Sequence, residues 1–357
     1  MSEKIFEQAA AWLDAGEPVA LATVVRIFGS SSQPLGARMA MTTGNRFVGA
    51  VSGGCVETDV YETAMVVLRR GAPLMLHYQQ VDDPLIEIGL NCEGKIDVLV
   101  EPLTPDTLLV HAERAPQRHV NVTVCTPGKP SAPDVRHARI EGDGRAEPPL
   151  PDAIVRDGLA ALRSDRPQTV SYDDGRVALF EPVLPPPTLL IFGADEAAVP
   201  LVRFAKLLGF RTVVTDGRAA FATRAKHPDA DEVIAAWPDE VVTRVDVSDR
   251  TYVVSLNHEP RFEDAMLHAL AGHEVAYIGA IGKRVRHLER VERAAAAGLD
   301  LSQFPTIHTP IGLDIGGKSP EEIALSIIAE IVAVKNGRPG GMLVTPLETS
   351  ALPQVSS

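Results

Sequence analysis

Residues Thr188 to Asp216 read TLLIFGADEAAVPLVRFAKLLGFRTVVTD, and the fold of the second half of the chain can be predicted from them. It opens with a nearly all-apolar run that suits a strand buried on both faces of a sheet. A glycine turn, a helical segment to Leu208 and a second apolar strand from Arg211 follow. Two strands joined by a crossover helix form a βαβ unit, so the stretch predicts a parallel sheet.

The same stretch has the layout of a dinucleotide-binding turn. Gly193 follows the first strand, and Asp216 ends the second strand 23 residues later, where an acid would grip a ribose hydroxyl. Asp195 replaces the second glycine of the G-x-G-x-x-G/A fingerprint and adds bulk and like-charge repulsion beside the pyrophosphate. A Rossmann-like fold is therefore predicted, while Asp195 argues against NAD(P) in its usual pose. An NAD(P)-dependent oxidoreductase is kept as the alternative function.

The rest of the second half continues the alternation of strands and helices. Strands are expected at 232–234, 251–256 and 274–279, and helices at 262–270 and 283–297. This alternation predicts a doubly wound parallel sheet. Asn257, His258 and Glu259 follow one of these strands at its carboxyl end, where ligands bind in such sheets. His258 is thus a candidate ligand contact, with a plain loop histidine as the other reading.

Residues 312–319, GLDIGGKS, match the phosphate-binding pattern G-x-x-x-x-G-K-[ST] of many NTPases. Pro310 interrupts the lead-in, and a single helix follows where an NTPase needs a second strand that ends in a magnesium-binding Asp. Ser319, Pro320 and Glu322 instead have the pattern of an N-cap, an N1 proline and a capping-box glutamate. The motif therefore predicts the start of a helix, whose backbone is still able to hold an anion.

The length of the chain favours two domains, because it has 357 residues and single cores rarely grow past about 250–300. Pro185, Pro186 and Pro187 form a stiff linker, where we place the boundary. We expect residues 1–184 to form an α+β ligand-binding domain, residues 185–345 the Rossmann-like domain, and residues 346–357 a C-terminal tail.

The first half is organised around Gly44 to Asp59, GNRFVGAVSGGCVETD, which reads as a short strand, a turn and the start of a helix. Gly53 and Gly54 let the backbone approach a ligand, and the N–H groups of a helix start point at a negative group there. Cys55 lies where a helix dipole favours thiolate. The turn thus suggests an anion cradle beside a soft ligand; a tight turn with a small buried cysteine is the alternative.

A second loop, GSSSQPLG, spans Gly29 to Gly36. Its hydroxyl and N–H groups, with Arg38 shortly behind, offer donors to a phosphate or another oxyanion, and a solvated turn is the alternative. The two loops leave adjoining strands, so we expect them to face one site. Cys92 lies in a similar glycine turn, whereas Cys125 lies inside an apolar strand and is expected in the core.

The composition excludes several classes of protein. A formal net charge of −13 argues against nucleic acid or an anionic membrane as a partner. The first residues lack the apolar core of a secretory signal, and no apolar run approaches the roughly 18 residues of a membrane span. The three cysteines are an odd number, which favours free thiols and a cytoplasmic location.

Long motifs in both halves resemble a known family. In the first half they are GSSSQPLGARM (29–39), VGAVSGGCVE (48–57) and GLNCEG (89–94); in the second they are LLIFGADEAAVPLVRFAKLLGF (189–210), VVTDGR (213–218), YIGAIGKR (277–284) and IHTPIGLDIGGKSPEEIALSIIAE (307–330). These motifs are similar to those of the XdhC/CoxI family, the accessory factors of molybdenum hydroxylases. The resemblance covers nearly the whole chain and is loose only between Leu103 and Pro187.

The resemblance implies a chaperone rather than an enzyme in its own right. Family members bind the molybdenum cofactor as molybdopterin, protect it during sulfuration and deliver it to a hydroxylase apoenzyme such as xanthine dehydrogenase. They act as homodimers and cooperate with a cysteine desulfurase. The cofactor-binding residues implied here are Gly29, Ser30, Ser31, Arg38, Ser52, Gly53, Gly54, Cys55 and Cys92; the hydroxyl-rich loop and the dinucleotide layout add Gly36, Gly193 and Asp216 as candidates. Of these, Cys55 would contact the metal, and Gly29, Ser30, Ser31 and Arg38 would hold phosphate.

The chain departs from the family pattern in three motifs. Ser32 and Gln33 stand where the family commonly has a Pro-Arg pair, and Glu93 interrupts a CGG motif. Asp195 and Glu196 replace the last two residues of a GAGH turn. An arginine lost and three acids gained weaken phosphate binding, so these positions mark either a divergent ligand or another task.

Overall fold

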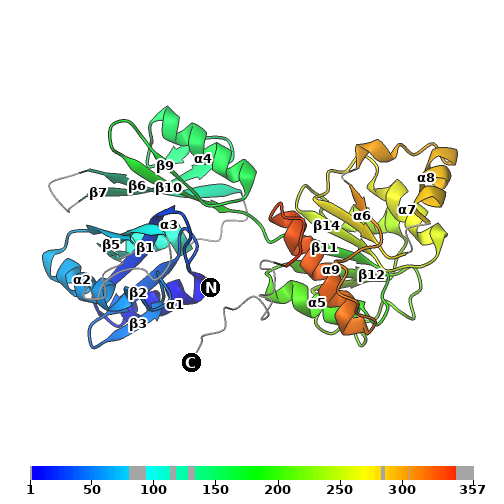
Figure 1. The fold of residues 1–357 in the computed structure, drawn as a ribbon, viewed down its shortest axis with the longest axis horizontal. Helices are drawn as coiled ribbons and strands as arrows, with labels where there is room; N and C mark the ends of the chain where they lie inside the picture. The colour runs from blue at the N-terminus through cyan, green and yellow to red at the C-terminus, as the bar shows by residue number, and fades with distance from the viewer. Residues whose placement is uncertain are drawn as a thin grey trace, which may run out of the picture. The chain divides into compact units, whose positions relative to one another are not determined.

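The computed structural model describes residues 2–79, 94–112, 118–127, 133–282, 286–304 and 306–342. The chain folds into two compact units, Met1–Pro185 and Pro186–Ser357 (Figure 1). The first unit mixes helices with antiparallel sheets and the second is built on a parallel sheet, which confirms the predicted α/β fold class. None of the helices within the described ranges is long and apolar enough to span a bilayer.

The first sheet of unit one has the strand order β3-β2-β1-β5-β4. Its strands are β1 (Val19–Phe28), β2 (Arg38–Thr42), β3 (Arg46–Gly49), β4 (Leu74–Gln79) and β5 (Lys95–Pro102). Side chains of a strand alternate between the two faces of a sheet, so Ala22 and Val24 pack toward α2 (Glu57–Arg70), while Leu21 packs toward α1 (Ser2–Asp14).

The second sheet of unit one has the order β8-β7-β6-β10-β9. Its strands are β6 (His119–Thr126), β7 (Asp134–Glu141), β8 (Ala146–Glu147), β9 (Gln168–Ser171) and β10 (Val177–Val183), with α4 (Asp152–Ser164) on one face and α3 (Pro105–Ala112) before β6. Val25 and Leu99 of the first sheet share a buried cluster with Cys125 and Leu179 of the second. Cys125 is 4% exposed, so its prediction as a core residue is confirmed.

The sheet of unit two is parallel, with the order β13-β12-β11-β14-β15-β16. The strands are β11 (Thr188–Phe192), β12 (Arg211–Thr215), β13 (Glu232–Ile234), β14 (Thr251–Ser255), β15 (Tyr277–Ala280) and β16 (Ile307–His308). Counted from β11, this is the order 3-2-1-4-5-6 of a Rossmann sheet. The direction of the order reverses between β11 and β14, so their carboxyl ends mark the switch point.

Helices cover both faces of this sheet (Figure 1). On one face α5 (Ala198–Leu207) packs beside α9 (Pro320–Lys335); the other face carries α6 (Pro238–Arg244), α7 (Pro260–Leu270) and α8 (Arg286–Ala296), and a 3₁₀ turn, η1 (Leu301–Gln303), follows α8. In α5 the buried residues Leu201, Val202 and Ala205 form one apolar stripe. The helix ends just before Gly209, whose φ of +81° few other residues adopt.

Candidate functional site

The turn Ser52-Gly53-Gly54-Cys55 joins β3 to α2. Gly53 and Gly54 have φ values of +84° and +118°, which favour glycine at both positions. Cys55 is a free cysteine whose side chain is half-buried at the start of the helix. The turn therefore presents a thiol at the helix start, as the sequence predicts.

The N–H groups of this turn already bind a carboxylate of the chain itself. Glu57 reaches back from the first turn of α2 and accepts hydrogen bonds from five backbone N–H groups and one hydroxyl: Val51 N (3.2 Å), Ser52 N (2.8 Å), Gly53 N (2.9 Å), Gly54 N (2.8 Å), Val56 N (3.2 Å) and Ser52 Oγ (2.6 Å). The N–H group of Cys55 donates to Ser52 Oγ at 3.0 Å. The predicted anion cradle exists, and Glu57 is the anion in it.

The hydrogen bonds to Glu57 determine its charge. Partial burial alone would raise the pKa of this carboxyl group, but the bonds from Ser52 and Gly54 outweigh burial and lower the pKa to about 2. Glu57 is therefore ionised at any physiological pH. Glu57 was not among the predicted site residues; its position shortly after a serine and two glycines was the signal that it closes the turn.

The hydroxyl-rich loop meets this turn, as predicted. The Ser32 hydroxyl donates a hydrogen bond to the Ser52 carbonyl oxygen. A Cβ atom built on Gly53 would lie 3.6 Å from Ser32 Oγ and 4.0 Å from Gln33 Nε2. Ser32 and Gln33, two of the positions that depart from the family pattern, thus lie against the Cys55 turn.

A third segment reaches the same loop. A Cβ atom on Gly94 would lie 1.8 Å from the Ser30 carbonyl oxygen, so only glycine allows this approach. Ser30 is exposed, and the Ser31 hydroxyl oxygen accepts a hydrogen bond from Gln33 N at 3.3 Å. Gly29 directly follows β1 and has a φ of +76°. Cys92 and Glu93, which precede Gly94, lie outside the described residues.

The structure corrects the predicted role of Arg38. Its guanidinium is 5% exposed and forms a two-point ion pair with Glu181 of β10, with Nη1 2.8 Å from Oε1 and Nη2 bonded to Oε2. Arg38 Nη1 also donates to the Gly36 carbonyl oxygen at 3.0 Å. A Cβ atom on Gly36 would lie 2.6 Å from Glu181 Oε1. Arg38 and Gly36 therefore hold Glu181 between the two sheets, and the guanidinium of Arg38 is bound by a carboxylate of the chain itself.

In unit two, Asp216 lies at the end of β12 as predicted, but its carboxylate is already hydrogen-bonded to other residues of the unit. Its side chain is fully buried and accepts from Ala194 N at 3.2 Å and from Arg218 N and Nε at 2.9 Å each. Burial disfavours the charged form, yet the bonds from Arg218 and Ala194 hold the pKa of Asp216 below its usual value. Arg218 also lies 4.2 Å from the ring centroid of Phe221. The acid expected at a ribose hydroxyl is bound by Arg218.

The turn after β11 is closed in a similar way. Gly193 has a φ of +111°. A Cβ atom built on Gly193 would lie 3.1 Å from Asn257 N, so the absence of a side chain allows this close approach. Asp195 Oδ1 accepts from Ala197 N (3.1 Å) and Ala198 N (3.3 Å), where a pyrophosphate would sit at the start of α5. Burial raises the pKa of Asp195 against the lowering effect of these two bonds. Asp195 and Asp216, the two acids of the dinucleotide layout, therefore both accept hydrogen bonds from unit two itself.

A third glycine turn precedes α9. Ser319 is the N-cap and forms a capping box with Glu322, which confirms the predicted helix start. Glu322 Oε2 accepts from Lys318 N at 2.9 Å and Ser319 N at 3.0 Å. The motif that matches a phosphate loop therefore also holds a carboxylate of its own helix.

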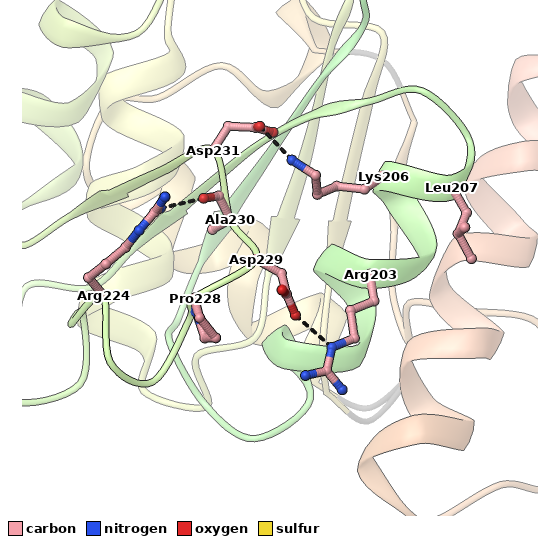
Figure 2. A pocket seen from close by; sticks show the side chains of 8 residues that line it. All are labelled: Arg203, Lys206, Leu207, Arg224, Pro228, Asp229, Ala230 and Asp231. Carbon is pink, nitrogen blue, oxygen red and sulfur yellow. Dashed lines mark hydrogen bonds and ion pairs between the residues drawn. The ribbon is translucent and has the colours of Figure 1, made fainter. Parts of the chain in front are cut away.

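A charged cleft of unit two lies between α5 and the segment that precedes β13 (Figure 2). It has a volume of about 760 Å³ and is lined by Arg203, Lys206, Leu207, Arg224, Pro228, Asp229, Ala230 and Asp231. Arg203 pairs with Asp229 at 2.7 Å and Lys206 pairs with Asp231 at 2.6 Å. Arg203 and Lys206 are thus each neutralised by a neighbouring acid, while Arg224 donates a hydrogen bond to the Ala230 carbonyl oxygen.

Within the described ranges, no group of three or more His, Cys, Asp or Glu side chains is placed to bind a metal ion. The Cys55 turn offers a single thiol. Such a turn does not suit a bare cation, which needs several protein ligands. It suits a soft metal that arrives with ligands of its own.

Comparisons with known proteins cover both units. Residues 189–331 match the family model described as the XdhC Rossmann domain, and residues 12–79 match the model of the XdhC and CoxI family. A crystal structure of a xanthine dehydrogenase from Bacillus halodurans has a TM-score of 0.70, with 26% sequence identity over 98% of each chain.

Two curated relatives are similar over most of their length. A probable xanthine dehydrogenase subunit of Bacillus subtilis (strain 168) is 27% identical over 327 residues, which are 91% of this chain and 96% of that protein. The molybdenum cofactor insertion chaperone PaoD of Escherichia coli (strain K12) is 24% identical over 326 residues, or 90% of this chain and 85% of that protein.

Proposed function

This chain belongs to the XdhC and CoxI family, and from this membership we propose that it carries the molybdenum cofactor during the maturation of a molybdenum hydroxylase. One relative is a molybdenum cofactor insertion chaperone, and another is named for xanthine dehydrogenase. The cofactor is cargo here: the protein binds it, shields it and passes it on.

The convergence of the hydroxyl-rich loop with the Cys55 turn is the observation that carries this proposal. It brings a half-buried thiol and a set of hydroxyl groups to one end of a rigid sheet. A thiol suits a soft metal, and hydroxyl and N–H donors suit the oxygen atoms of an anionic pterin. Cys55 would contact or shield the molybdenum, while Gly29, Ser30 and Ser31 would hold the phosphate.

We assign structural roles to four other predicted residues and keep a fifth as a ligand. Ser52, Gly53 and Gly54 shape the turn, because their N–H groups are bonded to Glu57. Arg38 supports the hydroxyl-rich loop, because it pairs with Glu181 and donates a hydrogen bond to the Gly36 carbonyl oxygen. Cys92 is kept in the proposal as a second thiol.

The finer parts of the proposal concern delivery. The chain would protect the molybdopterin form of the cofactor while a cysteine desulfurase supplies its terminal sulfur, and then pass it to a hydroxylase apoenzyme such as xanthine dehydrogenase. It would act as a homodimer in the cytoplasm. The NAD(P)-dependent alternative is not favoured, since Asp195 and Asp216 are bonded within unit two.

The test is to co-express the full chain with an active molybdopterin pathway and purify it without oxygen. Molybdenum is measured by elemental analysis and the pterin by the fluorescence of its oxidised form. We expect nearly one molybdenum and one pterin per chain. If neither copurifies from cells that make the cofactor, the carrier function is wrong.

Two cysteine variants locate the cargo. Cys55→Ala should lose most of the bound molybdenum, whereas Cys125→Ala removes a thiol from the core and should keep the wild-type content per folded chain. Equal cargo in Cys55→Ala and wild type would leave the carrier function standing and refute the role of Cys55.

A further inference from the structure

Glu57 uses its whole carboxylate to close the turn that presents Cys55. Each oxygen accepts three hydrogen bonds, and the donors run from Val51 to Val56 with the exception of Cys55, whose N–H group is bonded to Ser52 Oγ. Among these residues Val51, Ser52 and Val56 are buried. A pattern that resembles an empty anion cradle is, in the folded protein, a completed one.

We propose that Glu57 is a specificity residue of this turn: it excludes tetrahedral oxyanions such as phosphate, sulfate and molybdate, and leaves the Cys55 side chain as the group that the turn presents to a ligand. The inference deepens the proposed function and rests on it for the identity of the cargo. Its physical claim, the exclusion of oxyanions, concerns the unloaded protein.

Competition between a tethered and a free anion supports the proposal. An oxyanion binds to the N–H groups of the turn only if it displaces the Glu57 carboxylate. This carboxylate is covalently attached to the same chain and therefore competes at a high effective concentration. A second anion that bound beside Glu57 without displacing it would meet like-charge repulsion and find no N–H group free in this turn. Both routes are unfavourable, so inorganic anions are rejected.

This exclusion has a use in a cofactor carrier. Phosphate is abundant in cells, and molybdate is the free oxyanion of the same metal. A cradle of open N–H groups beside a thiol would bind either of them and block the thiol. With the cradle filled by Glu57, the turn selects for a ligand that coordinates sulfur, and the phosphate of any cofactor is held away from this turn.

Glu57→Gln is the variant that tests the claim. Glutamine keeps the shape, but its amide NH₂ is a donor that faces the donors Gly54 N and Ser52 Oγ, and the negative charge is gone. Glu62→Gln is the matched control, because Glu62 is exposed on the same helix and loses the same charge.

Binding is measured on the full chain without cofactor, by equilibrium dialysis against molybdate with elemental analysis and against radiolabelled phosphate. We expect Glu57→Gln to bind about one oxyanion per chain at least about ten times more tightly than wild type or Glu62→Gln, with molybdate and phosphate in competition. A folded Glu57→Gln protein that binds no more oxyanion than wild type overturns the proposal.

A measurement on wild type decides the matter if the variant does not fold. Hydrogen exchange of the peptide that covers residues 51–60 is followed without phosphate and with phosphate at about 100 mM. Unchanged exchange supports the exclusion, and slower exchange, which means that phosphate enters the cradle, overturns it. Neither assay uses the cofactor, so a failure of the carrier function would leave this result intact.

Discussion

The Cys55 turn of unit one and the Asp195 turn of unit two have the same construction and opposite energetics. Each follows a strand, contains glycine with positive φ, leads into a helix and has backbone N–H groups that hold a carboxylate of the chain. Glu57 accepts six hydrogen bonds and its pKa falls to about 2. Asp195 accepts two, at 3.1 and 3.3 Å, and its pKa is raised.

Burial and hydrogen-bond donors have opposing effects on the charge of each carboxylate. Desolvation disfavours both charges, but in the Cys55 turn the donors exceed this cost, and in the Asp195 turn they do not. Glu57 is therefore an integral part of its turn. Asp195 is held at a cost to stability, and its turn is the one from which the carboxylate is more easily removed.

Removal of the Glu57 carboxylate should have the largest effect. In Glu57→Ala, the buried N–H groups of Val51 and Ser52 lose their acceptor, whereas Val56 N keeps its hydrogen bond to Ser52 Oγ at 3.1 Å. Each unsatisfied buried donor costs about 1–3 kcal/mol. Partial relaxation leaves an expected local cost of about 3 kcal/mol, which corresponds to roughly 100-fold faster exchange. Hydrogen exchange of residues 51–60, followed by mass spectrometry, measures it.

The control for this prediction is Glu62→Ala on the same helix, which should leave exchange in residues 51–60 unchanged. Wild-type exchange rates in Glu57→Ala would mean that solvent replaces the carboxylate without cost. The claim that the hydrogen bonds to Glu57 stabilise the Cys55 turn would then be wrong.

Asp195→Asn should have a smaller effect of opposite sign. Asparagine caps a helix as well as aspartate does and carries no charge to desolvate. Because the folded-state pKa of Asp195 is raised, the folded protein binds more protons than the unfolded chain between the unfolded pKa of 3.8 and the folded pKa. The stability contributed by the protonated form is therefore lost as the pH rises through the folded pKa. We expect the variant to melt about 2 °C higher at pH 7, with no difference below about pH 3.8.

Asp216→Asn is the matched control in the same unit. The pKa of Asp216 is lowered by its bonds to Arg218, so its ionised form stabilises the protein above about pH 3.8 and this contribution is lost as the pH falls. The control should therefore melt lower than wild type at pH 7. Calorimetry between pH 3 and pH 8 measures both variants, and shifts of the same sign would contradict the assignment of burial as the dominant effect at Asp195.

The parts of the fold that were predictable from sequence are those set by local pattern. The βαβ stretch from Thr188 to Asp216 and the capping box at Ser319 depend on periodicity and on neighbours within a few residues. The core position of Cys125 follows from its place in an apolar strand.

The occupants of the candidate anion sites were not predictable in this way. Arg38 bonds to Glu181, which is 143 residues away, so its partner is fixed only by the packing of two sheets. Glu57 bonds to residues that precede its own helix, which the helix dipole alone does not require. In each case the sequence predicts an anion site, and the folded chain supplies the anion.

Glu322 provides the smallest expected effect and separates burial from the number of donors. Like Asp195 it accepts two backbone N–H groups at a helix start, but its carboxylate is fully exposed and its pKa is lowered by Ser319 and Lys318. Water can replace an exposed acceptor, so Glu322→Gln should melt within error of wild type between pH 3 and pH 8. Because the two acids share the same number of N–H donors, a change in Glu322→Gln as large as that in Asp195→Asn would mean that loss of charge at any helix start has this effect. An unchanged Glu322→Gln beside a stabilised Asp195→Asn would instead assign the difference to burial.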